Sequence, residues 1–110
     1  MEFSAGDIVL IRFPYSDGKG FKKRPALVLK GFEDGDLLLC RITSKIYDTS
    51  FDIQVADWSQ VGLLLPSVIR VHKMIVIEAE LIGQQIGKIS PDLFLKVSKI
   101  FASILIENEK

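Results

Sequence analysis

Apolar and polar residues alternate along several short segments in the first two thirds of the chain. Residues 7–13, with the sequence DIVLIRF, alternate and are rich in branched side chains, a pattern typical of a β-strand. Glycine-containing residues 15–20 predict a loop after it. The segment 78–87 is compatible with a short helical turn or with a strand that leads to Gly87. Similar short runs, bounded by turn-forming residues, predict further strands at 25–30, 37–42, 51–55 and 67–71.

One helix is predicted near the C-terminal end of the sequence. Ser90 is a favourable N-cap, Pro91 suits the first helical position, and Asp92 complements the positive end of the helix dipole. Apolar residues then recur at helical spacing, at Leu93, Val97, Ile100, Phe101 and Ile104. This helix has more apolar residues than one stripe needs, so we expect the excess to contact a second copy of the chain or a partner's helix. Short strands followed by one helix predict a mainly β fold, a small barrel capped by the helix, in one domain over residues 1–110.

The composition restricts the classes of protein to which the chain can belong. Its 110 residues are 48% hydrophobic with a formal net charge of +0, so nucleic-acid binding would depend on local clusters of cations. The single Cys40 excludes an internal disulfide and is expected to be a buried small hydrophobe. We find neither a membrane-spanning run nor a signal peptide, so we expect a cytoplasmic protein without membrane contact. We find no metal-ligand cluster and no glycine-rich phosphate loop, so we expect no cofactor.

The stretch GFKKRPALVL, residues 20–29, places three cations directly before a predicted strand. A residue that precedes proline is biased toward extended geometry, and proline itself suits the start of a strand. Arg24 is therefore held extended at the mouth of the strand, and its guanidinium should point outward because burying it without a partner is costly. Because the strand fixes the backbone of Arg24, only its side-chain rotamers remain to be ordered when an anion binds. Lys22 and Lys23 precede it and add positive charge.

An antiparallel hairpin of 25–30 and 37–42 would bring a hydroxyl beside this cation. If Lys30 pairs with Leu37, the register places Arg24 opposite Thr43, and directly opposed residues share one face of a sheet. A slip by one residue would send the two side chains to opposite faces. A fixed cation beside a hydroxyl suits a phosphate. The alternative, from residue types alone, is an ordinary solvated rim of the strand.

Five motifs follow one another in a fixed order along the chain. They are GDIVLIRFP (6–14), KRPALVL (23–29), ITS (42–44), GL…PSVIRVHK (62–73) and IGKIS (86–90), before the terminal helix. This ordered set resembles the MazF/PemK family of toxins from bacterial toxin–antitoxin pairs, and the resemblance extends from Gly6 to the last helix. It implies a small SH3-like β-barrel of the MazF/CcdB type with a C-terminal helix, which works as a homodimer.

The resemblance also implies an activity. Members cleave single-stranded RNA without metal, usually at short sequence motifs, and are neutralised by a cognate antitoxin. The family's arginine in the RP motif matches Arg24 and its threonine in the ITS motif matches Thr43, so these are the candidate catalytic residues. The implied reaction is attack of a ribose 2′-OH on the adjacent phosphate, which leaves a cyclic phosphate and a 5′-hydroxyl. The family's mobile loop matches 15–22, borders the site and can be displaced by the antitoxin.

Other side chains are candidates for contact with the RNA or for proton transfer. Arg24 would act by electrostatic stabilisation, because arginine is a poor base at neutral pH, although the family usually gives it an acid–base role. The sole histidine, His72, is an alternative base or a surface or interface residue, and we favour the second. Trp58 either stacks on a base or packs against the protein, and we favour packing. The candidates for RNA contact are Lys19, Lys22, Lys23, Ser44, Ser67, Arg70 and Lys73.

Two other functions remain open at this point. One is a non-enzymatic toxin on the same fold that poisons DNA gyrase through its terminal helix; that class lacks the arginine–threonine pair found here. The other is a decayed toxin that only binds an antitoxin. The zero net charge is compatible with a protein as the binding partner. An acidic, poorly ordered antitoxin tail would compete with RNA for the groove around Arg24.

Overall fold

The computed structural model describes residues 3–14 and 17–106, in which strands come first and one α-helix comes last. The predicted order of elements is confirmed, and the segment 78–87 contains both of its alternatives, a short 3-10 helix and then a strand. The elements are β1 (Asp7–Pro14), β2 (Phe21–Gly31), β3 (Asp36–Thr43), β4 (Asp52–Val55), β5 (Ser67–Glu78), η1 (Ala79–Leu81), β6 (Ile82–Lys88) and α1 (Pro91–Leu105).

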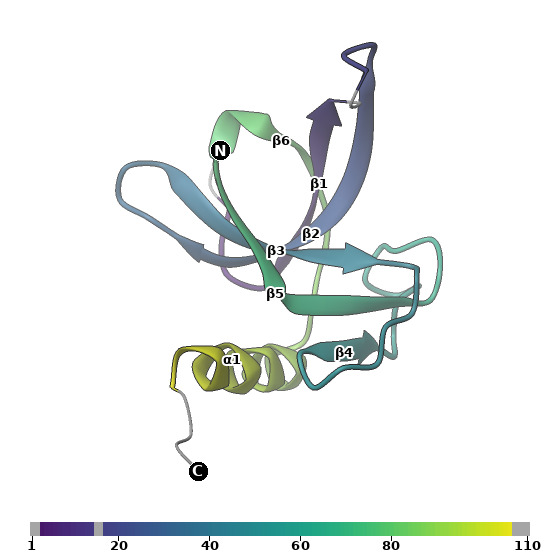
Figure 1. The fold of residues 1–110 in the computed structure, drawn as a ribbon, viewed down its shortest axis with the longest axis vertical. Helices are drawn as coiled ribbons and strands as arrows, with labels where there is room; N and C mark the ends of the chain where they lie inside the picture. The colour runs from purple at the N-terminus through teal and green to yellow at the C-terminus, as the bar shows by residue number, and fades with distance from the viewer. Residues whose placement is uncertain (1–2, 15–16, 107–110) are drawn as a thin grey trace.

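The strands form one six-stranded sheet in the order β4-β5-β3-β2-β1-β6, with every neighbouring pair antiparallel. The sheet curls strongly, and α1 lies outside the curl (Figure 1). The loop after β4 packs against β6 at the other edge: a Cβ on Gly87 would overlap the carbonyl group of Val61, and one on Gly62 would overlap that of Ile86. This close backbone contact requires glycine. The predicted mainly β fold with a C-terminal helix is confirmed.

Apolar residues on the two faces of the sheet form two separate clusters. The first cluster contains Ile8 of β1 and Leu27 of β2, and α1 packs on it through Val97, which is fully buried. The second cluster contains Val9 and Val28, the next residues along the same two strands. Successive side chains of a strand point to opposite faces, so β1 and β2 are buried on both sides. This double burial accounts for the high hydrophobic fraction of so short a chain.

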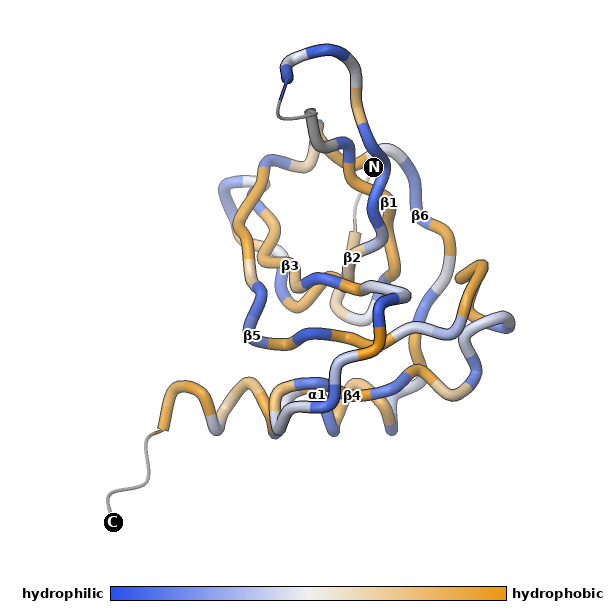
Figure 2. Tube along the Cα trace, turned by 45° about the vertical axis from the view of Figure 1, so that its right-hand side comes forward, coloured by the Kyte–Doolittle hydropathy of each residue, from blue (hydrophilic) through white to orange (hydrophobic). Residues whose placement is uncertain are grey.

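The helix begins as its sequence predicts. The backbone N–H of Leu93 donates to the Ser90 hydroxyl oxygen at 3.1 Å, and Pro91 occupies the first turn. Apolar residues continue to the end of α1 (Figure 2), where Leu105 and Ile106 are 68% and 66% exposed. The helix therefore has apolar surface beyond the part that packs on the sheet.

Two strands are longer than predicted. β2 begins at Phe21, because residues 21–23 extend the antiparallel pairing with β1 although they are exposed. Its start overlaps the loop that was expected at 15–22; residues 17–20 form a turn, and residues 15–16 lie outside the described part of the chain. β5 continues past residue 71 to Glu78, and its alternation is interrupted where the strand bends. The hydrophobic pattern misses both extensions because exposed or bent strand segments lack a regular buried face.

Candidate active site

The β2–β3 hairpin departs from the predicted register at its turn. Lys30 pairs with Leu38, so the predicted pairing of Lys30 with Leu37 is wrong. A shift between Val28 and Lys30 marks a β-bulge, in which one strand contains an extra residue. A bulge of this kind changes the register on one side of it only. Residues 28–30, where the shift occurs, include no glycine or proline that would signal its position.

Between the bulge and Arg24, the two strands keep the predicted register. Ala26 pairs with Arg41, and the same register extended by two residues places Arg24 opposite Thr43. On its other side Arg24 pairs with Ile11 of β1. Opposed residues share a face with Cβ atoms about 4.5–5.5 Å apart, so the ladder holds the backbone of both candidate catalytic residues.

Arg24 and Thr43 line the same cavity, which has a volume of about 530 Å³. Four of the seven candidates for RNA contact also line it: Lys22, Lys23, Ser44 and Ser67. The opposite wall is the apolar loop that precedes β5, where Leu64 is 90% exposed. No carboxylate side chain is among the described residues that line this cavity. A chain of zero net charge therefore has a local surface that is positive.

The hydroxyl groups at this cavity differ in their hydrogen bonds. The Thr43 hydroxyl oxygen accepts from the backbone N–H of Lys45 at 3.2 Å, which leaves its proton available to donate. The Ser67 hydroxyl donates to the carbonyl oxygen of Leu65 at 2.8 Å, and Ser67 is buried. Thr43 can therefore donate to a phosphate oxygen, whereas the Ser67 proton is used to hold the apolar loop.

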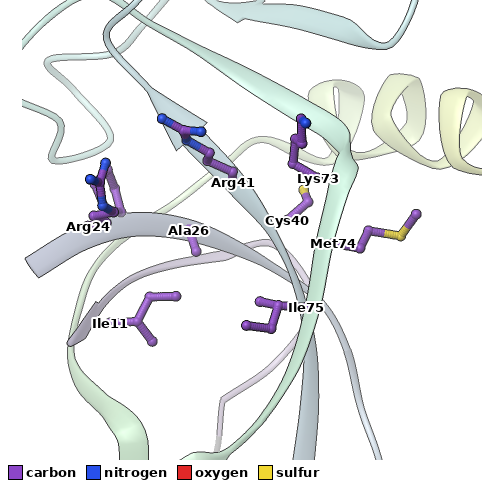
Figure 3. A pocket seen from close by; sticks show the side chains of 9 residues that line it. Ile11, Arg24, Ala26, Cys40, Arg41, Lys73, Met74 and Ile75 are labelled. Atoms are coloured by element: carbon purple, nitrogen blue, oxygen red, sulfur yellow. The ribbon is translucent and has the colours of Figure 1, made fainter. Parts of the chain in front are cut away.

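Arg24 also lines a second cavity, which has a volume of about 340 Å³. Figure 3 shows Arg24, Arg41 and Lys73 extending toward one side of it, with Ile11 and Ile75 beyond them. Arg41 was not a candidate in the sequence analysis. Its signal was a single cation in the apolar run LLLCRI, but nothing local indicated that its side chain would meet Lys73. In the sheet, β3 lies between β2 and β5 and brings the three cations together.

Two of the predicted RNA contacts lie apart from both cavities. Lys19 is exposed in the turn before β2. Arg70 is only 7% exposed; its Nε donates to the Asp52 carboxylate at 2.8 Å, and its guanidinium lies 3.5 Å from the centre of the Tyr47 ring. Its charge is therefore used inside the protein, and this placement indicates a structural role in place of the predicted RNA contact.

The carboxylate that pairs with Arg70 has a perturbed pKa. Burial alone would raise the pKa of Asp52, but hydrogen bonds from the Arg70 side chain and from the hydroxyl and backbone N–H of Thr49 outweigh it. Together with the nearby positive charge of Arg70, they lower the pKa from 3.8 to about 2. Asp52 and Arg70 are also directly paired residues of β4 and β5, so the ion pair links the two strands.

His72 and Trp58 line neither of the two cavities. The Nδ1 of His72 is buried without a hydrogen-bond partner among the described residues, and its ring centroid lies 5.2 Å from that of Phe51. Burial, then the charges of Arg70 and Lys73, lower the pKa of His72, although Asp52 acts in the opposite direction. Trp58 packs against the first apolar cluster, so packing is confirmed for it.

Cys40 is fully buried in the first cluster, as predicted, and burial raises the pKa of its thiol to about 12. Within the part of the chain that the structure describes, no three His, Cys, Asp or Glu side chains gather as a metal site would require. No helix in that part has the length and hydropathy needed to cross a membrane.

Comparison with known proteins gives one family and several similar folds. The family described as PemK-like, MazF-like toxin of type II toxin-antitoxin system matches residues 4–105. MazF in a MazE-MazF crystal structure from Deinococcus radiodurans is 19% identical, with a TM-score of 0.75, over 98% of this chain and 99% of that one. Mycobacterium tuberculosis toxin MazF-mt6 is 19% identical with a TM-score of 0.73, over 94% and 99% of the two chains.

A third similar structure is an endoribonuclease in complex with its cognate antitoxin from Mycobacterial species. It is 13% identical, with a TM-score of 0.77, over 99% of this chain and 100% of that one. No curated protein matches the sequence significantly.

Proposed function

Because the chain belongs to the family of PemK-like, MazF-like toxins of type II toxin–antitoxin systems, we propose that it is an endoribonuclease that cleaves single-stranded RNA. A structural neighbour that is described as an endoribonuclease supports this proposal at the level of the fold. The observation that carries it is the cavity lined by Arg24 and Thr43, in which lysines flank the arginine and no carboxylate of the described residues competes with a phosphate.

The chemistry we propose is an internal transfer within the RNA. The ribose 2′-oxygen attacks the adjacent phosphorus, and the bond from phosphorus to the 5′-oxygen of the next nucleotide breaks. A 2′,3′-cyclic phosphate and a 5′-hydroxyl result. Because the nucleophile is the 2′-OH, DNA would not be a substrate.

Arg24 would stabilise the negative charge that grows on the phosphate oxygens during this attack. Arginine placed at a transferring phosphoryl group is worth about 10³–10⁵ in rate in other phosphoryl-transfer enzymes. Within residues 3–14 and 17–106 ion pairs form at Arg70 and Lys88 but not at Arg24, so its charge remains available. Thr43 would donate its hydroxyl proton to a phosphate oxygen and fix the orientation of the phosphate.

The two proton transfers need groups other than Arg24. Arginine side chains stay protonated in proteins, so we do not assign the role of base to Arg24. The cavity is open to solvent on the side of the exposed loop, so water can accept the proton of the 2′-OH and return one to the leaving 5′-oxygen. We therefore assign Arg24 an electrostatic role.

We further propose a cognate antitoxin and a second copy of this chain as protein partners. One structural neighbour is an endoribonuclease in complex with its cognate antitoxin and another is a MazE-MazF complex, which supports the first partner. An acidic antitoxin segment would compete with RNA for the cations around Arg24. The exposed apolar residues of α1 offer surface for the second copy or for the antitoxin.

The reaction can be tested on RNA directly. The purified protein should cut a mixture of single-stranded RNAs at a subset of sequences, with EDTA present. An RNA that has one 2′-deoxynucleotide at a mapped cut should resist cutting at that position only, and mass spectrometry of the products should show a cyclic phosphate. Cutting that persists at the deoxynucleotide, or no cutting of any RNA, would refute the proposal.

A further inference from the structure

Three cations from three strands surround the smaller cavity. Arg24 comes from β2, Arg41 from β3 and Lys73 from β5, and no carboxylate is among the described residues that line it. Arg41 and Lys73 form no ion pair with any of the described residues, 3–14 and 17–106. Like charges in one cavity repel each other, so an anion bound between them would relieve the repulsion.

Strand pairing holds the backbones of Arg24 and Arg41 in place. Arg41 pairs with Ala26, and Arg24 pairs with Ile11; both Ala26 and Ile11 are buried members of the second apolar cluster. Arg24 and Arg41 are diagonal neighbours on one face of the β2–β3 hairpin, a relation that separates residues by about 7–8 Å. This distance is comparable to the span of one extended nucleotide. The two guanidinium groups therefore suit two consecutive phosphates better than one.

The smaller cavity adjoins the larger one, because Arg24 and Pro25 line both of them. A strand of RNA with one phosphate at Arg24 therefore has its neighbouring phosphate within reach of the smaller cavity. Ile11, Met74 and Ile75 give that cavity an apolar side, which suits a ribose or a base next to the phosphate. A planar guanidinium also matches the two free oxygens of a phosphodiester.

We propose that the smaller cavity is a second phosphate subsite, in which Arg41, assisted by Lys73, binds the phosphate next to the one that is cleaved. This inference rests on the proposed function, because its ligand is the same RNA strand. Arg41 is a positioning residue here: it holds the strand in place and does not touch the reacting atoms.

The subsite can be tested by measuring binding separately from cleavage. The probe is an RNA with a 2′-deoxynucleotide at the cut position, so that it binds without being cleaved, and its Kd is measured over a range of salt concentrations. Arg41→Gln should weaken binding about tenfold and reduce the slope of log Kd against log salt by about 0.7, the value for one phosphate contact to a single strand. Arg41→Lys should retain most of that slope, because it keeps the charge. Lys30→Gln, an exposed change at the far end of β2, is the matched control and should alter neither value.

A second probe identifies the phosphate itself. Single phosphates of the RNA are replaced one at a time by neutral methylphosphonates. With the wild-type protein, replacement of one phosphate adjacent to the scissile one should weaken binding as much as Arg41→Gln does. With Arg41→Gln, the same replacement should cause no further loss, because the contact is already absent.

The outcomes separate the subsite from the proposed function. If the wild-type protein neither binds nor cuts RNA, the proposed function fails and the subsite fails with it. If the wild-type protein cuts RNA while folded Arg41→Gln binds with the same Kd and salt slope, the subsite is overturned and the proposed function stands. If Arg41→Gln does not fold, the methylphosphonate series on the wild-type protein decides, and insensitivity of both neighbouring phosphates overturns the subsite.

Discussion

Arg24 and Arg70 are both cations on strands of one sheet, yet their surroundings give them opposite roles. Arg24 lines two cavities and forms no ion pair with the residues that the structure describes, whereas Arg70 is buried against Asp52 and Tyr47. The RP dipeptide revealed the extended backbone of Arg24 from local rules. The partner of Arg70 lies 18 residues away, and no local pattern predicts that ion pair.

The hydroxyl of Thr43 gives a first prediction at this scale. Thr43→Val keeps the size and β-branched shape of the side chain but removes the donor, and a hydrogen bond to a charged group is worth about 1.5–3 kcal/mol. We expect kcat for RNA cleavage to fall about 10–100-fold, with the fold unchanged. Thr43→Ser should retain most of the activity, and Ser50→Ala, an exposed hydroxyl that lines neither cavity, serves as the control. Equal activity of Thr43→Val and the wild-type protein would show that the hydroxyl has no catalytic role.

His72 gives the opposite prediction. It lines neither cavity, and its lowered pKa keeps the ring neutral in the folded protein at pH 7. We expect His72→Ala to cleave RNA with nearly the same kcat, and with the same pH profile between about pH 5.5 and 7.5. A large loss of kcat in a protein that still melts cooperatively would identify His72 as the base.

At the scale of the elements, the β2–β3 hairpin shows what a register assumption can provide. The assumption that every pair keeps one register was wrong at Lys30 and right at Ala26, because a bulge lies between them. The alternation of apolar and polar residues predicts neither the bulge nor the bend of β5, because both accompany the curling of the sheet. The sequence therefore predicted Arg24 beside Thr43 and proposed Lys73 as an RNA contact, while the placement of Arg41 beside Lys73 required the three-dimensional structure.

The Asp52–Arg70 pair gives a prediction for the contact between β4 and β5. The pKa of Asp52 is lowered to about 2 in the folded protein from 3.8, so the folded state binds this proton less readily than the unfolded state does. Its contribution to stability, about 2 kcal/mol, is therefore present above pH 3.8 and is lost as the pH falls toward 2.

Urea unfolding of wild-type protein and Asp52→Asn at several pH values measures this contribution. The variant should be less stable by about 3 kcal/mol or more at pH 7, because it leaves the buried Arg70 charge without its partner. The difference should become smaller between pH 4 and pH 2. Asp48→Asn changes an exposed carboxylate nearby and is the control. A difference that does not depend on pH would contradict the proposed role of the pair.

At the scale of the whole molecule, the two edges of the curled sheet meet through glycine. Gly87 lies against the carbonyl group of Val61 in the loop that forms one wall of the larger cavity, so closure of the barrel also places that wall. The sequence predicted a barrel from its short strands and its last helix. It could not identify this contact, because the two segments are joined only by the fold.

Gly87→Ala tests the closure. The added methyl group has no space beside Val61, and overpacking of this kind costs about 1–3 kcal/mol. We expect a lower melting temperature together with a higher KM for RNA, because the loop wall moves. Gly31→Ala is the matched control: its methyl group would meet Leu37 and the Phe3 carbonyl at ordinary contact distances of 3.4 and 3.6 Å. Equal melting temperatures for the two variants would show that the closure contributes nothing.

The most direct measurement is the single-turnover rate of RNA cleavage by the wild-type protein, Arg24→Lys and Arg24→Ala, with exposed Lys99→Ala as control. We expect Arg24→Ala to be slower by about 10³ or more, Arg24→Lys to lie between it and the wild type, and Lys99→Ala to equal the wild type, with all four proteins folded. An Arg24→Ala protein that cleaves RNA within about tenfold of the wild-type rate would contradict the central role of this guanidinium.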